Sequence, residues 1–170
     1  GLGLAKLLSG IAQAIRNKEE VRFYWVHSLF IAIIFLTLLQ TWWESWGARD
    51  TPTWTFIGLL IMLGAPIGLF LISHLIFPEN LVGVDLRSFY YEKMNPVLWI
   101  AVLTVIASAT FRSVVHGTQL FTLDNLSSFL LIPIFLSLTR TKNEVFRSGM
   151  VVLIFFALPA DILLVNMVIQ

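Results

Sequence analysis

Long apolar runs, separated by short clusters of charged residues, are the feature of this sequence that most restricts its fold. The stretches 25–43 (WVHSLFIAIIFLTLLQTWW) and 56–73 (FIGLLIMLGAPIGLFLIS) contain no Asp, Glu, Lys or Arg. A run of about 20 such residues, folded as a helix, matches the roughly 30 Å of a bilayer's hydrocarbon core. A helix also satisfies its backbone hydrogen bonds internally, which lipid requires. The pattern therefore predicts an all-α, polytopic transmembrane helix bundle.

The alternation predicts about six spans, joined by short loops, in a single domain of residues 1–170. Composition agrees, since 12% of the residues are charged, whereas a typical soluble domain carries about 25%. The first segment is short, and it reaches spanning length only if residues precede Gly1. We expect the spans at about 1–15, 23–43, 54–77, 96–115, 120–138 and 148–169.

Lysine and arginine are shared unevenly between the two sets of predicted loops. Eight of the eleven lie in loops 16–22, 78–95 and 139–147, whereas Arg49 and Arg112 lie on the opposite side. Cytoplasmic loops are enriched in these residues, so we expect the three loops in the cytoplasm and both termini outside. Tryptophans at the outer ends of the second and third spans predict an aromatic belt at headgroup depth; they are Trp42, Trp43, Trp46 and Trp54.

The longest predicted loop, 78–95, carries an amphipathic pattern. Leu86, Phe89 and Tyr90 fall at i, i+3 and i+4, with Val82 one turn earlier. On a helix these side chains share one face. The spacing predicts a short helix that lies on the cytoplasmic surface with its apolar face toward the membrane.

Ionisable residues within the spans are the main functional candidates, because each costs roughly 3 kcal/mol to place in lipid. Asp161 follows Pro159, which removes a backbone donor in the last span. An acid beside such a break fits a proton or cation site, and it also fits an ion pair with Arg112 that holds helices together. Glu44 and Arg112 lie at the outer ends of their spans and could join Asp161 in one charged cluster, as an outer gate or an interfacial ion pair.

Gly64, Pro66 and Gly68 lie together in the middle of the third span. Glycine and proline are the usual causes of helix kinks, so this span is the expected site of a kink or break. Pro159 predicts a second weak point in the last span.

Two histidines raise the question of a cofactor. His27 and His74 each lie one turn from the cytoplasmic end of neighbouring antiparallel spans. At one depth they could ligate haem b or a pigment, or relay protons; the alternative is a histidine hydrogen-bonded to a neighbouring helix. Because no further ligand supports the first interpretation, we expect no cofactor and no metal site.

Motifs of other function classes are absent from the sequence. There is no cysteine, no GxSxG and no HExxH, so we do not expect an enzyme. The net charge of +1 gives no sign of a nucleic-acid-binding surface.

Aromatic landmarks mark the first half and the middle of the chain. They are QTWWESWG at 40–47, the TWTF that follows at 53–56, and DLRSFYYE from Asp85 to Glu92. With the apolar runs around them, these stretches resemble a group of uncharacterised small polytopic inner-membrane proteins of bacteria. The resemblance implies a bacterial inner-membrane location. It carries no known activity, so no site residue is transferred from it.

Two classes of function fit these observations. A permeation protein, meaning a small channel or transporter for ions or small solutes, would place Asp161, Pro159 and the 64–68 stretch along its path. A structural or accessory subunit, or an effector, would use its helices mainly for contacts within a larger membrane complex. Either would be embedded in the lipid bilayer, as a homo-oligomer or with other membrane subunits, because six helices make a slim bundle. Of the two, we expect permeation.

Overall fold

A computed structural model of the chain describes residues 1–50, 53–116 and 125–165, without the side chains of Asp50, Val115, His116 and residues 161–165. The described residues form seven α-helices and one short 3-10 helix, and no strand is assigned among them. The all-helical prediction is therefore confirmed for this part of the chain. In order, the helices are α1 (Leu2–Arg16), α2 (Trp25–Gly47), η1 (Ala48–Asp50), α3 (Phe56–Leu75), α4 (Leu86–Lys93), α5 (Asn95–His116), α6 (Leu126–Arg140) and α7 (Glu144–Val165).

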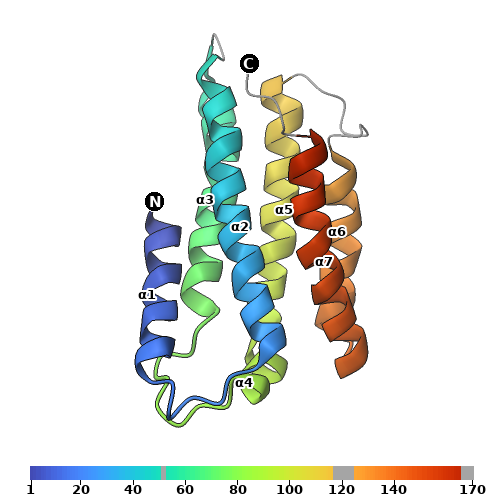
Figure 1. The fold of residues 1–170 in the computed structure, drawn as a ribbon. Helices are drawn as coiled ribbons and strands as arrows, with labels where there is room; N and C mark the ends of the chain where they lie inside the picture. The colour runs from blue at the N-terminus through green and yellow to red at the C-terminus, as the bar shows by residue number, and fades with distance from the viewer. Residues whose placement is uncertain (51–52, 117–124, 166–170) are drawn as a thin grey trace.

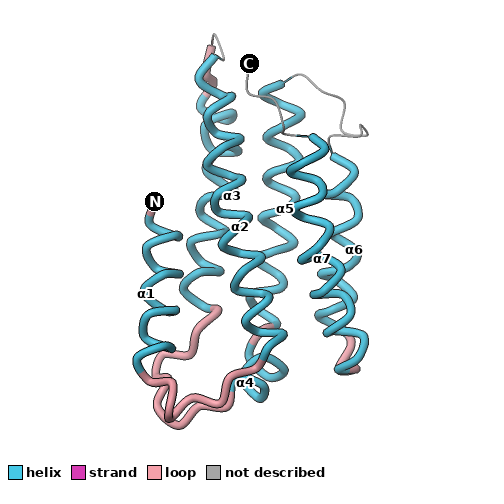
Figure 2. The backbone as a smooth tube through the Cα atoms, viewed as in Figure 1, coloured by secondary structure: helices cyan, strands magenta, loops and turns pink. Residues whose placement is uncertain are grey.

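The long helices stand side by side along a common axis (Figure 1), and the shorter α1 lies beside one half of the bundle, against α2 and α3. The connections 17–24, 76–85 and 141–143 lie at one end, together with α4 (Figure 2). We call this end the basic end, because it gathers the Lys- and Arg-rich loops. The opposite end, where α2 leads through η1 toward α3, is called the tryptophan end.

Three helices are long and apolar enough to cross a membrane, namely Trp25–Gly47, Phe56–Leu75 and Asn95–Val114. They match the second, third and fourth predicted spans. α6 is apolar but only 15 residues long, shorter than the predicted span 120–138, whose first five residues lie outside the described part. α7 has 22 residues and begins at Glu144, four positions before the predicted start.

The two long loops of the basic end are hydrogen-bonded to each other. The Arg22 N–H donates to the Val84 carbonyl at 3.0 Å, and the Leu86 N–H donates to the Arg22 carbonyl at 3.0 Å. Next to this bridge, four buried side chains form a small apolar cluster: Ala14, Val21, Leu81 and Leu86. The loops therefore fix the first two helix hairpins relative to each other.

α4 confirms the helix predicted within 78–95. Asp85 caps it by accepting a hydrogen bond from the Arg87 N–H at 2.9 Å, and Leu86 and Tyr90, one turn apart, are both buried. The predicted orientation of its apolar face toward the membrane is wrong for Leu86 and Tyr90, which are buried in the protein's own apolar clusters. The inclusion of Val82 in that face is also wrong, because the helix begins at Leu86 and Val82 lies before it. The reason is Gly83, whose φ of 72° turns the chain before the helix starts.

The tryptophans of the predicted belt are all exposed in the structure. The rings of Trp42 and Trp46 lie 6.4 Å apart, and the Arg49 guanidinium carbon lies 4.9 Å from the centre of the Trp46 ring. Exposed amphipathic rings at the end of apolar helices are what a membrane interface favours.

The tightest packing in the bundle joins α3 to α5. A Cβ atom placed on Gly64 would lie 2.9 Å from the Ala107 Cβ, and one on Gly68 would lie 2.0 Å from the Thr104 hydroxyl oxygen. Gly64 and Gly68, four residues apart, therefore let the two backbones approach, as small residues do in membrane helices. The helix assignment of α3 continues across Pro66, and the predicted kink there stays a prediction.

Gly68→Ala should destabilise the bundle. The new methyl would overlap the Thr104 hydroxyl, which is fixed by its own hydrogen bond to the Ile100 carbonyl at 2.7 Å, and overpacking of this kind costs roughly 1–3 kcal/mol. Thermal unfolding in detergent, followed by circular dichroism, measures the loss. Gly149→Ala is the matched control, because a Cβ there meets no atom within 4 Å. Equal stability of both variants would contradict the close α3–α5 contact.

Candidate functional site

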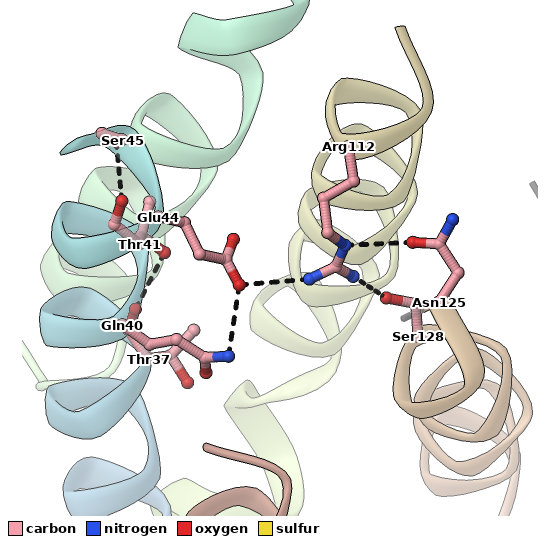
Figure 3. Close-up of polar contacts among 8 residues, drawn as sticks. All are labelled: Thr37, Gln40, Thr41, Glu44, Ser45, Arg112, Asn125 and Ser128. Atoms are coloured by element: carbon pink, nitrogen blue, oxygen red, sulfur yellow. Dashed lines mark hydrogen bonds and ion pairs between the residues drawn. The ribbon is translucent and has the colours of Figure 1, made fainter. Parts of the chain in front are cut away.

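Arg112 of α5 is the centre of a charged network near the tryptophan end (Figure 3). Its Nε donates to the Asn125 Oδ1 at 3.0 Å and its Nη1 to the Glu44 Oε1 at 3.2 Å. Its Nη2 donates to the Ser128 hydroxyl. All three guanidinium nitrogens thus have partners, and these partners come from α2, from the residue before α6, and from α6 itself.

Glu44 completes the α2 side of the network. Its Oε1 also accepts a hydrogen bond from the Gln40 Nε2 at 3.2 Å, one turn earlier on the same helix. On the far side, the Asn125 Nδ2 donates to the Ser113 hydroxyl at 3.3 Å. A continuous series of polar contacts therefore crosses the bundle from α2 through α5 to α6.

The network is largely shielded from solvent. The side chains of Arg112 and Glu44 are 16% and 18% exposed, and Asn125 and Ser128 are buried. A charge taken out of water is costly unless it is paired and hydrogen-bonded. Here the guanidinium has both a carboxylate and two neutral acceptors, so the shielded positive charge is both paired and hydrogen-bonded.

Sequence reasoning proposed Glu44, Arg112 and Asp161 as one cluster. The structure places Glu44 and Arg112 in contact, whereas the side chain of Asp161 lies outside the described residues. Pro159 lies within α7, which the helix assignment carries past it to Val165.

Four members of the network were missed by the sequence reasoning: Gln40, Ser113, Asn125 and Ser128. A signal existed, because Asn125 and Ser128 are three residues apart at the outer end of a predicted span, at the depth of Arg112. Asn125 also occupies the position before α6 that commonly caps a helix. Its side chain makes no capping bond there and accepts from Arg112 instead.

A small crevice adjoins the network on its α3 side. Its volume is about 10 Å³, close to the minimum that one water molecule needs. Polar and apolar side chains from three helices line it: Thr41, Glu44 and Ser45 from α2, Met62, Ala65 and Pro66 from α3, and Ser108 and Phe111 from α5.

Several hydrogen-bond acceptors belong to the residues that line the crevice. The Thr41 hydroxyl donates to the Thr37 carbonyl at 2.8 Å, and the Ser45 hydroxyl donates to the Thr41 carbonyl at 2.6 Å. With their protons so engaged, these hydroxyl oxygens offer lone pairs. Pro66 has no N–H, so the Met62 carbonyl lacks the helical donor that residue 66 would otherwise supply. Water or a small cation is the kind of species that such oxygens bind.

The two histidines occupy different environments. His27 is buried, with its Nε2 2.8 Å from the Ile76 carbonyl and its ring against Phe77, Phe89 and Tyr90. His74 is exposed and stacks on Phe70. No cluster of three or more His, Cys, Asp or Glu able to hold a metal ion occurs among the described residues.

Comparison with known proteins adds no relative. No protein-family model, curated protein or solved structure matches the chain.

The coupling free energy between Glu44 and Arg112 can be measured with a double-mutant cycle. Glu44→Gln and Arg112→Gln should each lower the free energy of unfolding by roughly 1–3 kcal/mol, because each leaves a shielded group without its charged partner. The double variant should lose less than the sum, with a coupling of roughly 0.5–3 kcal/mol.

Chemical unfolding in detergent gives all three values. Arg140→Gln, which removes an exposed charge at the basic end, is the control and should have little effect. Strictly additive losses would show that the two side chains are neighbours without being energetically coupled.

Proposed function

We propose that the chain is a multi-pass protein of a bacterial inner membrane that lets a proton or a small cation cross the bilayer. The observation that carries the proposal is the shielded Arg112–Glu44 network beside a small crevice partly lined by Glu44 and hydroxyl side chains, between helices apolar and long enough to span a membrane. Charged groups so placed usually belong to transport paths or proton relays.

Six spans are part of the proposal. Besides the three helices of spanning length, α1, α6 and α7 would complete the set, with α4 on the cytoplasmic surface. The loops with most of the lysines and arginines share the basic end (Figure 1), which supports a cytoplasmic basic end by the positive-inside rule.

The size of the crevice supports a small permeating species. With room for about one water molecule, it fits proton transfer or passage of a dehydrated cation better than passage of an organic solute. Glu44 would bind the cation or proton in competition with Arg112, and Asp161, on the last helix, would be the second acid of the path.

The second candidate is a structural or accessory subunit of a larger membrane complex. It is favoured by the completeness of the hydrogen bonding of Arg112, whose three nitrogens all have partners. A tie between helices needs such satisfaction, whereas a transport site needs a group that can exchange partners.

Proton flux into proteoliposomes that contain a pH-sensitive dye distinguishes the two candidates. The permeation proposal expects flux above that of protein-free vesicles, and Asp161→Asn and Glu44→Gln should each lower it about tenfold or more if they remove a proton-carrying group. Lys142→Gln, an exposed change at the basic end, should leave the flux unchanged. Absence of proton flux with the native chain would refute proton permeation and favour the subunit candidate, and flux in both acid variants equal to that of the native chain would refute the roles given to Asp161 and Glu44.

The orientation can be tested independently, because the native chain has no cysteine. Single cysteines at Asp50 and Asn143 should react with a membrane-impermeant maleimide from opposite sides of the cell membrane, Asp50 from outside. The reason is that an odd number of spans separates them in the proposed topology. Labelling of both from the same side would overturn the six-span arrangement.

A further inference from the structure

Arg147 of α7 is buried at the basic end, where only 2% of its surface is exposed. Its guanidinium carbon lies 4.9 Å from the centre of the Tyr90 ring and 5.0 Å from that of Tyr91, both on α4. Cation–π contacts of this kind are attractive and hold the guanidinium against the rings. The N–H bonds lie in the plane of the guanidinium group, and the two tyrosine rings provide no hydrogen-bond acceptor for them.

The buried polar side-chain atoms that lack a hydrogen-bond partner are concentrated around Arg147. Among the described residues, the buried side-chain atoms that lack a hydrogen bond are the Arg147 Nε and Nη2, the Tyr90 hydroxyl and the His27 Nδ1. The three residues are neighbours, since the Tyr90 ring touches the His27 ring at 6.3 Å between centres and lies under Arg147. Burying a polar atom without a hydrogen bond destabilises the fold, and more so when the group is charged. Their concentration indicates a missing partner of defined chemistry.

The donors define that chemistry. The Nε and Nη2 of arginine carry parallel N–H bonds. This edge of the guanidinium can donate to two oxygens of one carboxylate or phosphate in a bidentate arrangement. Burial raises the pKa of Tyr90 to about 12, so its hydroxyl keeps its proton near neutral pH and can donate as well. No carboxylate contacts Arg147 within the described residues, where the ion pairs are Arg87–Glu144 and Glu44–Arg112.

We propose that Arg147 and Tyr90 form a phosphate-binding site at the basic end of the bundle. The phosphate would take two hydrogen bonds from the Arg147 edge and one from the Tyr90 hydroxyl. His27, whose Nε2 faces the Ile76 carbonyl, presents its Nδ1 to a water or P–OH group beside the anion. A phosphate fits better than a carboxylate, because it offers oxygens to more than one donor direction.

An exposed ion pair lies one turn away from the proposed site on both helices. Arg87 precedes Tyr90 and Tyr91 by three and four residues on α4, and Glu144 precedes Arg147 by three on α7; such positions share a helix face. Arg87 donates to Glu144 across this seam, and both side chains are about half exposed. An incoming phosphate would compete with Glu144 for Arg87. Its source is either a lipid headgroup of the adjacent leaflet or free phosphate.

The thermal stability of the protein with two different probes tests whether the site binds phosphate and whether that phosphate is free or part of a lipid. The full chain in dodecyl maltoside, free of phosphate, is titrated with sodium phosphate against sodium chloride of equal ionic strength, and separately with dioctanoyl phosphatidylglycerol. The thermal midpoint should rise with at least one probe. A rise with the lipid alone identifies a headgroup site, whereas a rise with inorganic phosphate identifies a free anion.

Conservative variants test the residues. Arg147→Lys keeps the positive charge over the tyrosine rings but cannot form the bidentate hydrogen bonds. The probe concentration at half-saturation should therefore rise about tenfold. Tyr90→Phe keeps the ring and removes one donor, and it should weaken binding about threefold to tenfold; it also decides the matter if Arg147→Lys does not fold. Arg140→Gln, an exposed change nearby in sequence, should bind as the native chain does.

Three results would overturn the proposal. Neither probe stabilises the native chain beyond the chloride control, or Tyr90→Phe binds with unchanged affinity, or Arg140→Gln weakens binding as much as Arg147→Lys. The last result would show that charge at the basic end, rather than a built site, attracts the probe.

Discussion

The desolvation of charged side chains between apolar helices governs this bundle. Where α2, α5 and α6 meet, one guanidinium has a carboxylate, an amide oxygen and a hydroxyl as partners. Apolar contacts between membrane helices are nearly interchangeable with lipid contacts, so they specify relative rotation weakly. A shielded arginine is different, because it tolerates few arrangements. The rotation of the three helices near the tryptophan end therefore depends on the hydrogen bonds of Arg112.

Close backbone contact fixes the other main pairing. Gly64 and Gly68 lie against α5 at a distance that no side chain would permit, which sets how near α3 and α5 come. This pairing also brings Pro66 and Met62 of α3 to the crevice beside Glu44. The small residues thus have a role in packing, and through packing they shape the polar crevice on which the proposed permeation depends.

The two buried arginines present opposite situations. Arg112 has partners for all its nitrogens, whereas Arg147 lies against two tyrosine rings and has two nitrogens without a hydrogen bond. The hydrogen bonds of Arg112 join three helices, whereas the open edge of Arg147 is the basis of the proposed phosphate site. Since α4 carries both Tyr90 and the exposed Arg87, a phosphate bound at the basic end would tie α4 to the start of α7.

Periodicity and composition by themselves determined that the chain folds into apolar helices with basic loops at one end, because these properties arise from the length and polarity of local segments. They also predicted α4, although its start depended on the conformation of Gly83. The pairing of Glu44 with Arg112 was within reach, since both lie at the same depth. The contributions of Asn125 and Ser128, and the burial of Arg147 against two tyrosine rings, were decided only by the tertiary structure. Such contacts join residues far apart in the chain, and they depend on how each helix is rotated about its axis. A helix that is apolar on all sides has no sequence signal for that rotation.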